Sequence, residues 1–564
     1  MPFNLIEARW LPCRRASGAR NFYAPHEITS EFETDPIVAL DFPRPDWNAA
    51  VTELLIGLVS ATMPPEDSGE WAAAWVTPPK PDVLSEALAP LTFAFNLDGE
   101  GPRAFQDFSS LENSEEKPVS ALLIESPGEI TTKENKDLFV KRAGVEALSL
   151  PYAAAALVTL QTYAPSGGQG NRTSMRGGGP LTFLITPRRK HPRGGKLTTL
   201  WDVVWSNIRN AEEDLPPLTQ ALSKDHRRWP RVFPWLADTR VSLNDQSTIP
   251  DEHADRLQAY FGMPRRIRLI VESGGRGECS LGGPDGFGTV RAYRAVNYGI
   301  MYSGWEHPLS PYYIDKKNGK LPFHPQPGLA TYADWYAWWG LQDGVPAANL
   351  KTWPSRLGAI AGIVPDLDET RQRCVQTAGF DMDNMKARGF LDERIPYFEP
   401  TSDEPTWASN FQNSVRQLID GAKETANSLK YALRINQFAK WDAEKRIFKL
   451  LDNAPKDAFE DVVAAHWAAT QPAFVDALAK LHASDALDSD KMIRTDFHRV
   501  LRATALRLFD EATDIDTLAD QNPRRLVEAR RGLVIGLGAN GKVAAAMSIA
   551  EAKPKGKGGG GKKK

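Results

Sequence analysis

Glycines and basic side chains concentrate in one stretch of the chain, residues 165–196. It reads PSGGQGNRTSMRGGGPLTFLITPRRKHPRGGK and holds eight glycines, seven Lys or Arg residues and no acidic residue. Glycine lets a backbone approach a ligand closely, and arginine offers a planar fork that matches phosphate oxygens. The composition therefore fits a polyanion that is contacted by both main chain and side chains. A surface loop between two strands accounts for the composition equally well.

A second segment, residues 378–388, has residue types that could enter a nucleic-acid groove. It reads AGFDMDNMKAR, so a turn-forming glycine precedes a polar and apolar tip at residues 383–385. An amide and a flexible thioether can insert at a base step while the cations behind them hold flanking phosphates, as wedges of architectural proteins do. The alternative is an ordinary loop between two domains.

Basic side chains also recur along a predicted C-terminal helix. Arg494, His498 and Arg502 follow one another at intervals of four residues and would share one face. Such a face could meet a phosphate backbone. The favoured alternative is a solvent-exposed face whose cations pair with acids such as Asp496 and Asp510.

A glycine motif near the C-terminus matches the dinucleotide fingerprint GxGxxG. It is Gly536-Leu-Gly538-Ala-Asn-Gly541, preceded by Leu-Val-Ile. A dinucleotide site also needs a second parallel strand and an acid about 20 residues further on, but the chain runs into a Lys/Gly tail from residue 553. We interpret the motif as helix packing or a break between a helix and a loop. A nucleotide-dependent oxidoreductase using this motif stays as an alternative function.

No motif in the sequence requires an enzyme. HExxH, Walker, GxSxG and zinc-finger spacings are all missing, and the nine histidines are scattered. Three cysteines, Cys13, Cys279 and Cys374, define neither a disulfide framework nor paired zinc ligands. We predict no catalytic residue, no metal and no cofactor, and we expect His466 and His498 to be structural.

The whole chain has the composition of a globular protein with several domains. Its 564 residues exceed one hydrophobic core, so two to four domains are expected. The formal net charge is −3, so nucleic acid could be bound only through local basic patches. The N-terminus lacks the order of a signal peptide, and the longest apolar run, residues 145–164, is interrupted by polar residues and a proline. We predict a cytoplasmic protein without a membrane span.

Before residue 400 the chain predicts short strands around a few helices. The expected elements are a strand (3–10), a helix (45–61), two short strands (92–97 and 121–124), a helix (145–163), and strands and turns (264–345). The helix over 145–163 leads directly into the glycine stretch and would position it.

Beyond residue 400 helices dominate. Four amphipathic segments are expected, near 411–433, 456–482, 491–510 and 523–551, and Pro472 is expected to kink or divide the second. The fold class is therefore α+β, with a large mixed N-terminal domain followed by a four-helix bundle. The predicted boundaries are a mixed domain (1–398), a linker (399–406), the bundle (407–551) and a disordered Lys/Gly tail (552–564).

Taken together, several segments resemble the large subunit of the type I-E CRISPR Cascade complex, the CasA family. The resemblance covers roughly residues 3–550 and depends on the order of individually modest motifs. These are Phe3-Asn4-Leu5 with Trp10-Leu11-Pro12, Leu40-Asp41-Phe42-Pro43-Arg44, Met175-Arg176-Gly177-Gly178-Gly179-Pro180, Trp305-Glu306-His307-Pro308-Leu309-Ser310-Pro311 and GFDMDNMKAR at 379–388.

The resemblance implies a DNA-recognition subunit, not an enzyme, in an RNA-guided ribonucleoprotein complex of antiviral defence. In such complexes guide pairing reads most of the target, and protein reads a short flanking motif, the PAM. The family's large subunit reads the PAM through the minor groove, whose code is degenerate, and helps to open the duplex and start the R-loop. The implied partners are the guide crRNA, double-stranded target DNA with its PAM, the backbone, small and guide-end subunits of Cascade, and a helicase–nuclease recruited in trans. No membrane partner is implied.

The resemblance also assigns roles to particular positions. The residues that it implies are a glycine loop (Gly167, Gly168, Gln169, Gly170) with Asn171 and Arg172, a wedge (Asp383, Asn384, Met385) with Lys386, a guide-end loop (Phe139, Val140, Lys141), and Arg294, or else Arg291, on the strand before Trp305.

Three departures from the family pattern bear on these roles. Some relatives carry a cysteine cluster before that strand, and this chain keeps only Cys279, so no zinc is expected. Gln169 stands where a relative can have glycine, and the charge of Asp383 disfavours a close approach to phosphate. A scaffold subunit with no DNA contact is the second alternative function.

Overall fold

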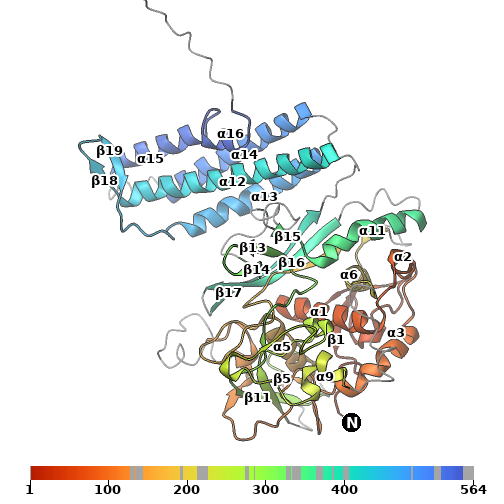
Figure 1. Ribbon diagram of the computed structural model, residues 1–564. Coiled ribbons are helices and arrows are strands. Elements are labelled where there is room, and N and C mark those ends of the chain that lie inside the picture. The colour runs from red at the N-terminus through yellow and green to blue at the C-terminus, as the bar shows by residue number, and fades with distance from the viewer. Residues whose placement is uncertain are drawn as a thin grey trace, which may run out of the picture. The chain divides into compact units, whose positions relative to one another are not determined.

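The protein divides into two compact units (Figure 1). The first comprises residues 1–326 and 337–397, and the second comprises residues 327–336 and 398–564. The computed structural model describes residues 2–127, 134, 144–190, 195–211, 227–272, 279–284, 286–325, 332, 344–363, 373–383, 386–397, 405–483, 487–513 and 522–550. The predicted tail and most of the predicted linker lie outside this range.

The second unit takes in a short segment that the sequence-based boundaries assign to the first domain. Tyr332 stacks on Phe474, with ring centroids 4.3 Å apart, and meets Trp467 edge-on. Both partners belong to a helix of the second unit, so aromatic packing ties this segment to that unit.

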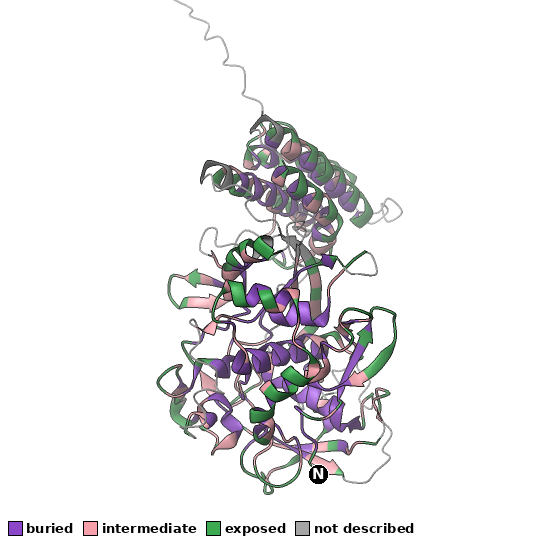
Figure 2. Ribbon diagram, turned by 90° about the vertical axis from the view of Figure 1, so that its right-hand side faces the viewer, coloured by how far each residue is buried: buried purple, intermediate pink, exposed green. Residues whose placement is uncertain are grey.

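Two apolar helices form the interior of the first unit. They are α1 (Pro45–Thr62) and α5 (Leu150–Tyr163), and all but a few of their residues are buried, as Figure 2 shows in purple. Helices that are apolar all round belong inside a domain. Both predicted helices are confirmed. The second begins later than predicted, because a short strand occupies residues 148–149 and Pro151 stands in the first turn of the helix.

Several small sheets surround these helices. In one, the strand order is β2-β1-β3, and in another it is β10-β11-β4, with β5 also on β11. Their bounds are β1 (Leu11–Arg15), β2 (Arg20–Tyr23), β3 (Ile37–Leu40), β4 (Glu116–Pro118), β5 (Leu148–Ser149), β10 (Arg266–Glu272) and β11 (Thr289–Val296). A third sheet, ordered β14-β13-β15, contains β13 (Tyr312–Asp315), β14 (Gly319–Pro322) and β15 (Gly344–Val345).

Three predicted strands of this unit are wrong. Residues 3–10 make a single bridge at Asn4 and then turn, and the strand begins only at Leu11. Residues 92–97 and 121–124 overlap the 3-10 helices η2 (Ala89–Ala94) and η3 (Val119–Leu122). Pro90 stands in the first turn of η2, where its fixed φ suits a helical turn, and η3 begins directly after Pro118, the last residue of β4.

One sheet joins distant parts of the chain, in the order β17-β16-β6. The strands β16 (Arg373–Asp383) and β17 (Lys386–Tyr397) form a long antiparallel hairpin, and β6 (Thr182–Thr186) pairs with the other edge of β16. Residues 378–383 and 386–388 therefore belong to the strands of this hairpin, and the alternative of an ordinary loop between domains is wrong for them.

Short elements complete the first unit. They are α2 (Ser68–Val76), α3 (Pro81–Leu88), α6 (Leu200–Ser206), α9 (Trp229–Val232), α11 (Ala348–Ile363), η1 (Pro25–Glu27), η4 (Pro234–Leu236), η5 (Leu243–Asp245), η6 (Arg256–Tyr260), β7 (Arg189–Lys190), β8 (Lys196–Leu197), β9 (Ser247–Thr248) and β12 (Met301–Tyr302).

The second unit is a helical bundle, as predicted. Its elements are α12 (Pro405–Phe438), α13 (Glu460–His482), α14 (Leu487–Ala512), α15 (Pro523–Gly536), α16 (Lys542–Ala546) and a hairpin of β18 (Ala439–Asp442) and β19 (Ile447–Leu450). Pro472 lies inside α13 and does not divide it. The hairpin was not anticipated from the sequence. No helix in the described part of the chain is both long and apolar enough to cross a membrane.

Candidate nucleic-acid interface

The glycine loop lies between the end of α5 and the start of β6. Its tip is exposed at Gly168 and Gln169. Gly168 and Gly170 have φ values of +75° and +78°, a left-handed conformation that glycine adopts at little cost. The sequence therefore places glycine where the turn requires it.

Hydrogen bonds inside the protein hold the four carbonyl groups of this tip. The backbone N–H of Asn171 donates to Gly168 O (3.2 Å), and the side-chain amide of Asn171 donates to Gly167 O. The next two carbonyls accept from Asn297 Nδ2 (2.9 Å) and Tyr298 N (2.7 Å), which follow directly after β11. Because these oxygens are engaged within the protein, the exposed side of the loop presents less negative charge to an approaching anion.

The two residues after the tip brace the loop. Arg172 donates to the hydroxyl (2.7 Å) and the carbonyl (2.8 Å) of Ser242 and lies 5.9 Å from the ring centroid of Tyr298. Asn171 Oδ1 accepts from Arg265 Nη1 at 2.5 Å. Arg172 and Asn171, both predicted to contact DNA, therefore form hydrogen bonds inside the protein that support the loop. A DNA contact by either side chain would require these hydrogen bonds to break.

The hairpin of β16 and β17 packs against the base of the glycine loop. A Cβ added at Gly179 would lie 2.7 Å from Phe380 O and 2.8 Å from Met382 Cγ, and one at Gly379 would lie 2.5 Å from Pro180 O. These glycines therefore let the two backbones touch. The structure brings the base of the loop, at residues 179–180, against the hairpin, although the two are about 200 residues apart in the chain.

The predicted wedge follows the end of β16. Asp383 pairs with Lys386 in the ladder, which is the last pair of the hairpin among the described residues. Lys386 is exposed, and Asp381 pairs with Arg388 at 2.9 Å behind the turn. Asn384, Met385 and the side chain of Asp383 lie outside the described residues, so their role stays a prediction.

Arg294 lies on β11, the strand that ends beside the glycine loop. Its guanidinium pairs with Glu116 across the sheet at 2.8 Å, and its side chain is 27% exposed. Arg291 on the same strand makes a looser pair with Glu272 at 3.4 Å. A partly exposed pair is worth about 1 kcal/mol or less, so a phosphate could compete for either cation. The guide-end residues Phe139, Val140 and Lys141 lie outside the described residues.

A buried polar cluster around Glu53 holds Arg176, which follows the tip of the glycine loop. Glu53 on α1 accepts from Arg176 (2.8 Å), Tyr163 (2.8 Å) and Thr182 (2.7 Å). Arg176 is 3% exposed and also donates to Ser310 Oγ at 3.0 Å. Arg176 therefore holds the loop to the core and does not face a ligand.

The same cluster includes His307, which belongs to the Trp305–Pro311 motif of the sequence. His307 Nε2 lies 3.7 Å from Glu53, and burial, with the charge of Arg176 as a further cause, lowers the pKa of His307 well below its usual range. Burial, and then Glu53, raises the pKa of Tyr163 well above its usual range. Glu53 was missed at the sequence level, where a lone carboxylate inside an apolar helix was the available signal.

A basic face on the C-terminal helix, whether open to phosphate or to solvent as favoured above, is wrong for two of its residues. Arg494 on α14 donates to the carbonyls of Met547 (2.9 Å) and Asp490 (3.2 Å), and His498 is 7% exposed. Burial lowers the pKa of both. Arg499 is exposed and pairs with Asp496 at 2.5 Å, as the alternative of a solvent-exposed face predicted.

The GxGxxG motif is a break between two helices. Gly536 ends α15, Gly541 precedes α16, and a Cβ at Gly541 would lie 2.2 Å from Gly536 O. The residues before the motif are helical, whereas a dinucleotide site needs a strand there. This rules out the oxidoreductase built on this motif.

Metal ligands do not gather in the described residues, where no group of three or more His, Cys, Asp or Glu side chains could hold an ion. Residues 273–278, just before Cys279, are outside that range, so the expectation of no zinc stays a prediction.

The sequence matches the family model described as CRISPR-associated protein Cse1 over residues 4–508. The chain belongs to the Cse1 family. This confirms the resemblance to the large subunit of type I-E Cascade. The order of small motifs therefore identified the family correctly, although each motif alone is weak.

Solved structures share the fold of this Cse1-family chain at low identity. A structure of Thermus thermophilus CasA (Cse1) is 18% identical with a TM-score of 0.64, covering 97% of this chain and 99% of that one. Cse1 from Acidimicrobium ferrooxidans is 17% identical with a TM-score of 0.62, covering 98% and 99%. A chain from a CRISPR RNA-guided surveillance complex is 15% identical with a TM-score of 0.61, covering 94% and 99%.

Proposed function

We propose that this Cse1-family chain is the subunit of an RNA-guided CRISPR surveillance complex that reads the PAM. It assembles with the guide crRNA and with the backbone, small and guide-end subunits, contacts the PAM duplex from the minor groove, and helps to start the R-loop. A separate helicase–nuclease, recruited in trans, cuts the target. The chain itself is not an enzyme in this proposal.

The single observation that carries the proposal is the close packing of the hairpin against Gly179 and Pro180, at the base of the glycine loop. The loop is a bare backbone turn whose carbonyl groups are engaged inside the protein, and the last described pair of the hairpin is Asp383 with Lys386. A flat backbone surface suits a groove about 6 Å wide, where the base pattern is degenerate. In this proposal the end of the hairpin separates the neighbouring base pairs, as the wedges of architectural proteins do.

Opening the duplex has a free-energy cost that other contacts must offset. Unstacking a base step costs on the order of a few kcal/mol, and contacts to the phosphate backbone with guide pairing offset that cost. In this proposal Lys386 on the hairpin and Arg294 on β11 supply cations, and each trades a solvent or surface contact for a phosphate.

A substitution at Gly168 tests the proposal. A Cβ there meets no atom within 4 Å, so Gly168→Asp adds a carboxylate to the loop surface without a clash. We expect binding of PAM-containing duplex by the assembled complex to weaken at least about tenfold, about 1.4 kcal/mol, because the carboxylate repels phosphate.

Gly18→Asp is the matched control. Gly18 also has a positive φ, +89°, and also meets no atom within 4 Å, so both variants place the same side chain at a positive φ in open space. Equal duplex affinity for the two variants would contradict a DNA-contacting loop and would favour a scaffold subunit without DNA contact.

A further inference from the structure

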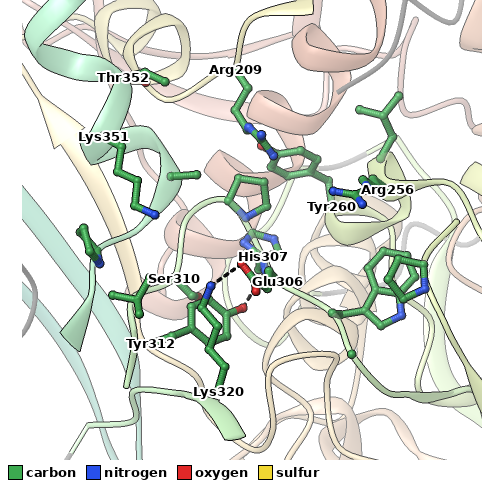
Figure 3. Close-up of a pocket in the computed structure, with 18 residues that line it drawn as sticks. Arg209, Arg256, Tyr260, Glu306, His307, Ser310, Tyr312, Lys320, Lys351 and Thr352 are labelled. Carbon is green, nitrogen blue, oxygen red and sulfur yellow. Dashed lines mark hydrogen bonds and ion pairs between the residues drawn. The ribbon is translucent and has the colours of Figure 1, made fainter. Parts of the chain in front are cut away.

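Several polar side chains around the pocket of the first unit, about 420 Å³ in volume, are already engaged inside the protein (Figure 3). Lys320 pairs with Glu306 at 2.5 Å, and the hydroxyl of Tyr312 accepts from the backbone N–H of His307 at 2.6 Å. A polar side chain with hydrogen-bonding capacity to spare lies elsewhere in this unit. It is the exposed Asn297, beside the tip of the glycine loop.

Asn297 follows β11 directly and packs against the tip. Its Nδ2 donates to the carbonyl of Gln169 at 2.9 Å, and a Cβ added at Gly170 would lie 2.8 Å from the Cβ of Asn297. Both Gln169 and Asn297 are exposed. The side chain of Asn297 therefore borders the exposed tip of the loop.

The residue after Asn297 has a strained backbone. Tyr298 has a φ of +63°, a left-handed conformation that is unfavourable for a bulky side chain. Its N–H donates to Gly170 O at 2.7 Å, and its carbonyl accepts from the N–H of Ser242 at 3.2 Å. Strain of this kind persists only where the surrounding contacts hold it, and it concentrates at functional sites. These hydrogen bonds fix residues 297 and 298 against the loop.

The hydrogen bond to Gln169 sets the direction of the Asn297 amide. Because a carbonyl oxygen can only accept, Nδ2 must face Gln169, and Oδ1 is directed elsewhere. Within the part of the chain that the structure describes, Oδ1 accepts no hydrogen bond. The amide therefore presents an accepting oxygen whose orientation is set by the loop itself.

An accepting oxygen can distinguish base pairs in the minor groove. A·T and T·A pairs present only acceptors there, whereas a G·C pair adds the 2-amino donor of guanine. An amide oxygen accepts from that amino group and is repelled by the acceptors of an A·T pair. The backbone N–H groups of a loop are donors, which match acceptors that every base pair has, so they make this distinction poorly.

We propose that Asn297 is a specificity-determining residue for PAM reading, which accepts a hydrogen bond at Oδ1 from the 2-amino group of a guanine in the PAM. The inference deepens the proposed function and rests on it, because it requires the tip of the glycine loop to lie in the minor groove. It adds that the preferred PAM contains a G·C pair beside this tip.

Inosine tests the contact, because it is guanine without the 2-amino group. Selection of duplexes with a randomised PAM by the assembled wild-type complex gives the preferred motif, and each guanine in its base pairs is then replaced by inosine in turn. We expect one replacement to weaken equilibrium binding by the wild type about fivefold, the effect of one neutral hydrogen bond. The same replacement should leave the affinity of the Asn297→Ala complex unchanged. The weaker pairing of inosine with cytosine affects every variant alike.

Ser242→Ala is the control that separates base reading from support of the loop. Ser242 Oγ accepts from Arg172 Nε at 2.7 Å, so the change removes a contact that supports the loop and keeps Asn297. We expect this variant to bind the guanine and the inosine duplex more weakly by the same factor, and so to keep the ratio of the wild type.

The outcomes separate this inference from the proposed function. Asn297 is not a PAM reader if the selected motif lacks a G·C pair, if no inosine replacement weakens binding by the wild type, or if Asn297→Ala keeps the wild-type ratio. Loss of the ratio in Ser242→Ala as well would reduce Asn297 to a support of the loop. In each of these cases a sequence preference remains, and the proposed function stands. Duplex binding without any sequence preference would contradict the proposed function and the inference together.

Discussion

At the scale of residues, the glycines and Arg176 of the opening motif have different tasks. The glycines at 168 and 170 allow the turn, and those at 179 and 379 allow two backbones to touch. Arg176, which composition alone counts among the phosphate-binding cations, is buried against Glu53. A basic residue in a glycine-rich segment can therefore serve the fold while the glycines around it form the candidate surface.

Glu53→Gln tests the buried cluster. The change keeps the shape of the side chain but leaves Arg176 as a buried cation without its carboxylate. Removing one partner of a buried pair typically costs about 3–5 kcal/mol. We expect a loss of that order in the free energy of unfolding, measured with urea on the isolated chain.

An exposed pair supplies the control for this measurement. Glu511 lies 2.7 Å from Arg507, and both side chains are more than half exposed. Glu511→Gln should change the free energy of unfolding by less than about 1 kcal/mol. If Glu53→Gln had no larger effect than this, the cluster would not be what holds the loop to the core.

At the scale of elements, the hairpin of β16 and β17 shows what local patterns can and cannot reveal. The glycine and the polar tip at 379–385 indicated a wedge. The structure adds that the strands of this hairpin, β16 and β17, are eleven and twelve residues long. Its pairing with β6 could not be predicted, because that contact joins residues about 190 positions apart and no local periodicity encodes it.

The central helices were predictable for the opposite reason. The apolar spacing in α1 and the proline at its start are local signals, and the observed helix ends within one residue of the prediction. The β18–β19 hairpin, in which Trp441 pairs with Phe448, was missed because it is short and lies between two long helices.

Gly379→Ala tests the contact between the hairpin and the loop. The new Cβ would stand 2.5 Å from Pro180 O, so the backbones must separate. We expect duplex binding by the assembled complex to fall about tenfold or more, because the shift changes the surface that the hairpin and loop share.

Gly389→Ala on the partner strand provides the comparison. A Cβ at Gly389 meets no atom within 4 Å, so the same chemical change is made on the same hairpin without a clash. A Gly379→Ala complex that binds duplex as well as the Gly389→Ala complex would show that close packing of hairpin and loop is not needed.

At the scale of the whole molecule, charge and composition restricted the function more than they revealed it. A net charge of −3 excludes general coating of nucleic acid and leaves local surfaces. The division into a mixed unit and a helical bundle follows from the change of pattern near residue 400. The segment around Tyr332 joins the second unit through aromatic packing that the sequence alone does not indicate.

The candidate site could be located from the motifs, but Arg172 and Asn171 could not be recognised as residues that support the loop. Their partners, Ser242 and Arg265, are distant in sequence.

The central claim is that the tip of the glycine loop lies against the PAM duplex. The most direct measurement is photo-crosslinking of the assembled complex to target DNA, with p-benzoylphenylalanine in place of exposed Gln169 and, as control, in place of exposed Asn21 on β2. We predict that position 169 crosslinks to the base pairs of the PAM and that position 21 does not. Crosslinks from position 169 that are absent, or that match those of position 21 in yield and location, would contradict the account.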